Sequence, residues 1–362
     1  MRTPAHGKEK ANSMKRVFGR QRDWSQLIVR AIGFLLLALI IYGSIATLRE
    51  QRYTAQQWLD FVIFGLAQGG VYALIALGYT MVYGVLRLIN FAHSEVFMFG
   101  ALATYFLGNA LDKSGFLDRQ PIITLLALFI FAGAVSMTLA VLLERVAYRP
   151  LRHAPRLVPL ITAIGASLFL QYTARGLFGA SVKVVPTFDI LQGTVFGIRK
   201  ILIVVFFAAM LMMALLYAFI QFTKTGRAIR AVSEDQEAAT LMGVDVDRTI
   251  ATTFAVGGAM AGFAGVLYGL VYKQIYFFIG FVPGIKAFTA AVLGGIGNIP
   301  GALVGGLVLG VTESVGPSLF LDGLGIPAAH QLKDVIAFMM LVLILIFRPT
   351  GILGERLATK RA

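Results

Sequence analysis

The chain has 362 residues, of which 58% are apolar and only 14% are charged. An ordinary soluble domain has about 25% charged residues, so this composition excludes a soluble domain. It also excludes a disordered chain, because disordered chains are polar and charge-rich. In a soluble protein, a formal charge of +14 would indicate binding to nucleic acid. In a membrane protein, basic loops beside the bilayer bind anionic lipid and stay on the cytoplasmic side. The composition therefore indicates an integral membrane protein that contacts membrane lipid and binds no nucleic acid.

Several classes of chemistry are excluded by the residues that the chain lacks. It has no cysteine, which removes disulfides, iron–sulfur clusters and thiol catalysis. The four histidines are widely separated, so we predict no metal site and no cofactor. The sequence contains no G-x-x-x-x-G-K-[ST] phosphate loop and no recognisable Ser-His-Asp arrangement. We therefore expect a protein that is not an enzyme and binds no nucleotide itself.

Uncharged apolar runs recur along the chain, and most approach the roughly 20 residues that a helix needs to cross the hydrocarbon core. The runs are 31–48, 61–86, 96–111, 122–143, 157–174, 201–220 and 249–272. A last span is expected to begin near Ala328. The fold class that follows is all-α, a polytopic transmembrane helical bundle of about 8–10 spans.

The first apolar run admits two interpretations. Ser44-Ile45-Ala46 is a small-x-small sequence of the kind that signal peptidase cleaves. The polar lead before the run is long for a signal peptide, however, and we favour a retained signal anchor. We then expect a basic cytoplasmic segment at 1–30 and an extra span with an outer loop at 31–57.

The stretch 283–312 differs from the other runs, because it contains Lys286 and is interrupted at Asn298-Ile299-Pro300-Gly301. Proline and its neighbours interrupt a helix. Irregular backbone at membrane depth survives only where protein buries it or where it lines a cavity. We therefore predict two short half-spans, or a re-entrant pair, in this stretch.

The distribution of lysine and arginine predicts the orientation. With the N-terminus inside and alternating spans, most of the 32 basic residues fall on the cytoplasmic side. The cytoplasmic segments are then 1–30, 84–95, 144–156, 223–248 and 348–362. Both termini, including a basic tail at 349–362, are expected in the cytoplasm.

Glycines spaced four residues apart within the spans predict flat helix surfaces that pack closely. Such sets are Gly65/Gly69, Gly258/Gly262, Gly265/Gly269, Gly297/Gly301/Gly305 and Gly306/Gly310. We interpret them as helix-packing surfaces, with a sliding seam for alternating access as the alternative.

Polar residues at membrane depth are costly, and each requires a partner or a wet cavity. Asn90, His93 and Glu95 are expected near the cytoplasmic ends of the second and third spans, where we favour a capping role over contact with a substrate. Either Asn90 or Ser94 caps the helix that follows, and Glu95 lies near its positive N-terminal end. For Lys286 we favour snorkelling to the outer interface; otherwise it lines a pathway or pairs with Glu313. The candidates for a translocation pathway are Gln68, Tyr72, Asn90, Lys286 and Thr289.

The longest internal polar segment, 223–249, predicts a short amphipathic helix at about 233–242. Ser233 is a candidate N-cap, with Gln236 at the spacing of a capping box. Gly243 is a suitable residue to end the helix. The apolar face of this helix has no cover in its own loop, so we expect it to bind a partner protein.

This segment contains Glu237-Ala238-Ala239-Thr240-Leu241-Met242-Gly243, which fits the pattern E-A-A-x-x-x-G. The pattern resembles the EAA signature of ATP-binding-cassette importer permeases, although the isoleucine and Leu-Pro that follow in that signature are not clear here. In those permeases the segment is a coupling helix docked in a groove of the ATPase subunit. The resemblance implies a role in ATPase coupling for Ser233, Glu237, Ala238, Ala239, Leu241, Met242 and Gly243.

Four further stretches resemble the LivH-type permease of bacterial branched-chain amino-acid importers. They are 65–98, 144–150, 286–297 and 348–354, and the resemblance covers roughly 58–356. It implies a permease transmembrane domain at 58–348 that carries the coupling loop 223–249. Only the first 57 or so residues depart from a typical member.

The resemblance implies a permease subunit of the bacterial inner membrane that imports branched-chain or related small amino acids. The implied partners are a second, related permease in a heterodimer, two cytoplasmic ATPases and a periplasmic substrate-binding protein. Related permeases carry urea, short amides or other small solutes, which is the first alternative. A gradient-driven secondary transporter is a second alternative, for which matching broken helices in two halves would be expected.

Overall fold

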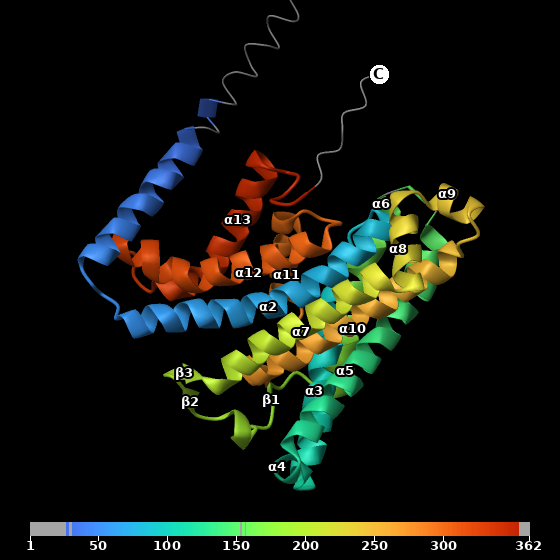
Figure 1. Ribbon diagram of the computed structural model, residues 1–362, viewed down its shortest axis with the longest axis horizontal. Helices are drawn as coiled ribbons and strands as arrows, with labels where there is room; N and C mark the ends of the chain where they lie inside the picture. Colours follow the sequence, from blue (N-terminus) through green and yellow to red (C-terminus); the bar gives the residue numbers. More distant parts are fainter. Residues whose placement is uncertain (1–26, 29–30, 153, 156, 355–362) are drawn as a thin grey trace, which may run out of the picture. The chain divides into compact units, whose positions relative to one another are not determined.

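The computed structural model describes residues 27–28, 31–152, 154–155 and 157–354. The predicted basic segment 1–30 lies almost entirely outside the described residues, as does most of the basic tail. The described chain is nearly all helical (Figure 1). After a first helix at Ala31–Arg49, the α-helices are α2 (Ala55–Leu86), α3 (His93–Lys113), α4 (Phe116–Arg119), α5 (Pro121–Leu143), α6 (Leu157–Phe178), α7 (Lys200–Phe222), α8 (Lys224–Glu234), α9 (Gln236–Leu241), α10 (Val246–Tyr272), α11 (Phe281–Gly294), α12 (Ile299–Gly316) and α13 (Lys333–Phe347).

The strands are two-residue ladders in the loops. They are β1 (Lys183–Val184), β2 (Thr194–Val195), β3 (Ile198–Arg199) and β4 (Gln274–Ile275), with β1 antiparallel to β4 and β2 antiparallel to β3. Short π-helical and 3₁₀ turns adjoin α5, α12 and α13, at Glu144–Tyr148, Arg149–Leu151, Pro317–Leu321, Asp322–Leu324 and Ala329–Leu332. Another 3₁₀ turn, Asp189–Leu191, lies in the loop between β1 and β2.

Eight helices of the described part are long and apolar enough to cross a membrane. This confirms the predicted polytopic helical bundle. The eight are Ala31–Arg49, Ala55–Leu86, Pro121–Leu151, Leu157–Phe178, Lys200–Phe222, Val246–Tyr272, Ile299–Leu324 and Ala329–Phe347, and α11 is a shorter apolar helix.

The chain forms two compact units, 1–54 with 316–332, and 55–315 with 333–362. Within the smaller unit, Gly43 lies against the backbone of Phe320 and Gly323, where any side chain on Gly43 would collide. Arg52 donates a hydrogen bond of 2.8 Å to the carbonyl of Asp322. Close backbone contact and this bond therefore hold the first helix to the turn at 317–324.

In the larger unit, α10 is the central helix. It packs against α2, α3, α5 and α7, which lie alongside it in Figure 1. The contacts are so close that a methyl group on Gly262 would meet the backbone of Ala132 and Gly133. Likewise, one on Gly69 of α2 would meet the backbone of Gly306. The predicted glycine surfaces are thus helix-packing surfaces, except at Gly297, which has φ +96° and lies in the turn between α11 and α12.

The predicted break in 283–312 exists, but it lies at 295–298, and the expectation of two short half-spans is wrong for its second half. Pro300 is the second residue of α12, a position where the missing N–H forms no helical bond anyway. It therefore begins a helix instead of interrupting one, and the candidate span continues to Leu324. The C-terminal segment closes the break, because the amide of Ile352 donates to the carbonyl of Leu293 at 2.8 Å.

Both α3 and α11 begin part-way along α10, not at its end. Gly78 of α2 lies against His93, the first residue of α3, and also against Gly257 of α10. Gly257 is near the middle of the 27-residue α10. Gly284, in the first turn of α11, lies against Ser94. The start of α11 is therefore at mid-depth in the bundle, as in a broken membrane helix.

Candidate functional site

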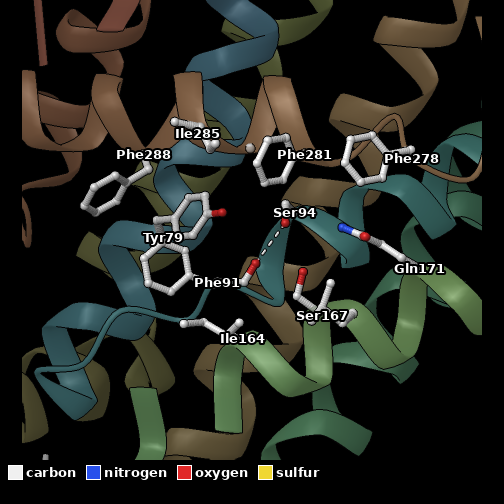
Figure 2. A pocket seen from close by; sticks show the side chains of 12 residues that line it. Tyr79, Phe91, Ser94, Ile164, Ser167, Gln171, Phe278, Phe281, Ile285 and Phe288 are labelled. Carbon is white, nitrogen blue, oxygen red and sulfur yellow. Dashed lines mark hydrogen bonds between the residues drawn. The ribbon is translucent and has the colours of Figure 1, made fainter. Parts of the chain in front are cut away.

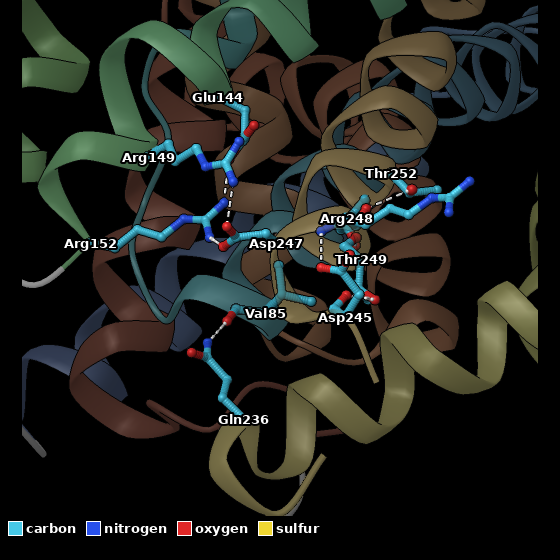
Figure 3. Close-up of polar contacts among 11 residues, drawn as sticks. Val85, Glu144, Arg149, Arg152, Gln236, Asp245, Asp247, Arg248, Thr249 and Thr252 are labelled. Atoms are coloured by element: carbon cyan, nitrogen blue, oxygen red, sulfur yellow. Dashed lines mark hydrogen bonds and ion pairs between the residues drawn. The ribbon is translucent and has the colours of Figure 1, made fainter. Parts of the chain in front are cut away.

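Three predicted cytoplasmic segments meet at one end of the bundle. Arg87, which follows α2, donates to the carbonyl of Ser233 at 2.7 Å, and Gln236 donates to the carbonyl of Val85 at 2.5 Å. Arg149 and Arg152, which follow α5, both pair with Asp247 at the start of α10 (Figure 3). Val85 and Arg87 of segment 84–95 thus share one end with parts of segments 144–156 and 223–248, as alternating spans require, whereas residues 93–95 belong to α3, which begins at mid-depth.

The ion pairs at this end cross-link helices that are far apart in sequence. Besides Asp247, Arg152 contacts Glu144, whose side chain is fully buried. Asp247 itself is about half exposed. The sequence analysis missed this cluster, because Asp247 lies 95 and 98 residues from its two arginines and no local pattern links them.

The predicted helix at about 233–242 is present as α9, but its predicted start at Ser233 is wrong, because residues 233 and 234 belong to α8. Asp235 has an extended backbone (φ −153°) that ends α8. Its Oδ1 accepts hydrogen bonds from the amides of Glu237 and Ala238 at 2.9 and 3.0 Å, so Asp235 is the N-cap of α9. Ser233 is not the N-cap, since its hydroxyl donates to the carbonyl of Arg230 within α8.

The predicted end of this helix at Gly243 is confirmed. Gly243 has φ +82°, a left-handed conformation that glycine adopts without strain. Its amide donates to the carbonyl of Thr240, and the amide of Val244 donates to the carbonyl of Ala239. These two bonds form a Schellman motif, which fixes the end of α9.

The faces of α9 differ in burial. Ala239 is buried against the bundle, whereas Glu237 and Ala238 are exposed. Leu241 and Met242 are 88% and 84% exposed. The helix is therefore attached through one face and presents two large apolar side chains outward.

Lys286 of α11 lies in a buried ion cluster. Its Nζ is 2.5 Å from a carboxylate oxygen of Glu313 and 2.6 Å from one of Asp334. The favoured prediction that Lys286 snorkels to the interface is wrong, because its side chain is only 4% exposed. The alternative, a pair with Glu313, is confirmed.

Three of the five predicted pathway residues gather at this cluster. Gln68 donates to the hydroxyl of Tyr72 at 2.5 Å, and that hydroxyl lies 3.4 Å from Glu313, which Lys286 holds. Asn90 lies elsewhere and accepts a bond of 2.6 Å from Tyr148. Thr289 only bonds back to the carbonyl of Ile285 in its own helix. The five residues therefore do not line a single pathway.

A separate cavity of about 270 Å³ lies between α2, α3, α6 and α11, and none of the five residues lines it. Most of its surface is apolar. The hydroxyls of Tyr79, Ser94 and Ser167 and the amide of Gln171 lie on one side of it (Figure 2). The rings of Phe278, Phe281 and Phe288 form another part of its wall.

Glu95 lies directly behind the polar side of this cavity and is completely buried. Its Oε1 accepts hydrogen bonds from Gln171 at 2.7 Å and Ser167 at 3.1 Å. The hydroxyl of Ser94 lies 3.2 Å from the same oxygen and shares its single proton with the carbonyl of Phe91, 2.8 Å away. The Oε2 of Glu95 accepts no hydrogen bond. All three donors line the cavity.

The predicted capping role for Asn90 and Ser94 is wrong. The N-cap of α3 is Ala92, with no side-chain bond, and the hydroxyl of Ser94 donates to the carbonyl of Phe91. Glu95 does lie in the first turn of α3. Its partners on α6 are 72 and 76 residues downstream, so no sequence signal pointed to the cavity.

Comparison with known proteins identifies similar sequences. A family described as "branched-chain amino acid transport system / permease component" matches residues 61–345. The high-affinity branched-chain amino acid transport system permease protein BraD of Pseudomonas aeruginosa is 46% identical, over 82% of this chain and 96% of the relative. The LivH proteins of Salmonella typhimurium and Escherichia coli are 43% and 42% identical, each over 83% of this chain and 98% of the relative. No solved structure matches the chain significantly.

Proposed function

The chain belongs to the branched-chain amino acid transport permease family, and from this premise we propose that it is the permease of an ATP-driven importer for branched-chain or related small amino acids. As a member of this family it is a multi-pass membrane protein and a transport subunit, not an enzyme. The observation that carries the proposal is the family match over 61–345, which includes most of the candidate spans.

The proposed assembly contains a second permease, two cytoplasmic ATPases and a periplasmic substrate-binding protein in the bacterial inner membrane. The relatives are named as the permease proteins of a transport system, which supports further components. This sequence has no phosphate loop, so the energy for import comes from a separate ATPase subunit.

We place the α9 end of the bundle, and both termini, in the cytoplasm. This end gathers the basic residues Arg87, Arg149 and Arg152 and the basic helix α8. Loops rich in lysine and arginine stay on the cytoplasmic side.

In this orientation α9 is the coupling helix, and Leu241 and Met242 dock into an apolar groove of the ATPase. Two exposed apolar side chains at the tip of a helix are a costly surface unless a partner covers them. Gln236 joins α9 to the end of α2, and the loop after it leads directly into α10. A movement of the ATPase is thus transmitted to the two central helices.

The double variant Leu241→Asp/Met242→Asp tests this docking. Two carboxylates in an apolar groove are costly to desolvate, so we expect at least about tenfold less ATPase to co-purify with the permease. Phe196→Asp is the matched control, because Phe196 is 93% exposed in the β2–β3 turn, away from α9. Full co-purification with the double variant would refute the coupling role of α9.

A further inference from the structure

A buried carboxylate without a complete set of partners lies behind the wall of the cavity between α2, α3, α6 and α11. Glu95 has 0% exposure, and its Oε2 receives no hydrogen bond. A buried charge without a partner is strongly destabilising. A cation in the neighbouring cavity would offset part of this cost.

The N-terminus of α11 lies at the same corner. A methyl group on Gly280, the residue before α11, would be 3.0 Å from Oε2 of Glu95. The positive end of the 14-residue α11 dipole stabilises negative charge there. The N-terminus of α11 therefore offsets part of the cost of burying this carboxylate.

The rest of the cavity suits an alkyl chain. Its wall is formed by phenylalanine, isoleucine and leucine side chains, which include Phe278, Phe281 and Leu168. A cavity of about 150 Å³ binds benzene, so a cavity of about 270 Å³ has room for a small apolar amino acid. Since α11 begins at mid-depth, this space lies within the membrane part of the bundle.

We propose that this cavity is a binding site for small apolar amino acids within the permease, in which the side-chain oxygens of Ser94, Ser167 and Gln171 bind the α-ammonium group and the negative charge of Glu95 behind them attracts it. The alkyl side chain then lies against the phenylalanine rings. This proposal rests on the proposed function, and it assigns part of substrate selection to the membrane subunit.

The test uses a leucine analogue with a side-chain diazirine, photolysed with the permease–ATPase complex in nanodiscs without the binding protein. Mass spectrometry locates the labelled residues. We expect labels on α6 and α11 around Leu168 and Phe281. Leucine should prevent labelling, whereas 4-methylpentanoate, which lacks the ammonium group, should not.

Glu95→Gln should raise the leucine concentration needed for half-protection at least about tenfold, because the amide carries no negative charge to attract the ammonium group. Glu144→Gln is the matched control, since Glu144 is a buried carboxylate outside the cavity. Leucine should protect this variant from labelling at the same concentration as the wild type.

Three results would overturn the site: no label on α6 or α11, equal competition by 4-methylpentanoate, or unchanged protection in Glu95→Gln. Even if Glu95→Gln does not fold, competition of leucine and 4-methylpentanoate with the analogue on the wild-type chain tests the proposed site. Leucine uptake by the wild-type importer, measured in parallel, separates failure of this site from failure of the proposed function.

Discussion

Single side chains decide where the exposed helix α9 begins and how it is presented. Ser233 and Asp235 are both residues that cap helices well, so the sequence around them admitted two starting points. The extended backbone at Asp235 and its two accepted amide bonds select the second. Gly243 was identifiable from sequence, because a glycine after a short apolar helix is the usual end signal.

Asp235→Ala should weaken the start of α9. Loss of an N-cap costs about 1 kcal/mol, so amide hydrogen exchange at Glu237 and Ala238 should accelerate about fivefold. Ser233→Ala removes only a bond within α8 and is the control. Equal acceleration in both variants would mean that Asp235 is not the cap.

Buried polar residues show the limit of sequence analysis most clearly. Glu95 and Lys286 were recognised as unusual at membrane depth, but their partners depend on helices brought together by the fold. Ser167 and Gln171 come from α6, and Glu313 and Asp334 come from α12 and α13. Sequence patterns report periodicity along one helix, whereas these contacts depend on how several helices pack.

At the scale of elements, the short helix α11 is held by charge as well as by packing. Lys286 on α11 pairs with Glu313 on α12 and Asp334 on α13. The two partners differ, because Glu313 is buried and Asp334 is 41% exposed. If Lys286 is removed, water can solvate the carboxylate of Asp334 but not that of Glu313. The ion pair with Glu313 is therefore the more important of the two for stability.

Lys286→Met should destabilise the chain by about 3–5 kcal/mol, because it leaves the carboxylate of Glu313 buried and unpaired. The thermal unfolding midpoint in detergent measures this. The double variant Lys286→Met/Glu313→Gln should recover part of the loss, since the buried charge is then absent. A single variant as stable as the wild type would show that Lys286 does not stabilise this cluster.

At the scale of elements the sequence was also informative about the spans themselves. Long uncharged runs gave the positions of most of the candidate spans, because the thickness of the bilayer fixes the length of an apolar helix. Pro300 was misread as a break, since proline at the start of a helix and proline inside one look alike in sequence.

At the scale of the whole molecule, the proposed function involves three features of the larger unit. The proposed coupling helix α9 lies at one end, α2 and α10 contact the segment that carries it, and the cavity beside Glu95 lies at mid-depth between α2, α3, α6 and α11. The composition predicted the helical bundle, and the distribution of basic residues predicted which loops lie on the same side of the membrane. Neither could predict the cavity, which depends on α3 and α11 both starting part-way along α10.

Uptake of labelled leucine into proteoliposomes tests the central claim most directly. The vesicles contain the permeases and ATPases, with ATP enclosed and the substrate-binding protein outside. The account predicts leucine accumulation that requires enclosed ATP, the ATPases and an intact α9, and that is lost in Leu241→Asp/Met242→Asp. Equal uptake by this chain alone, without ATPase subunits, would contradict it.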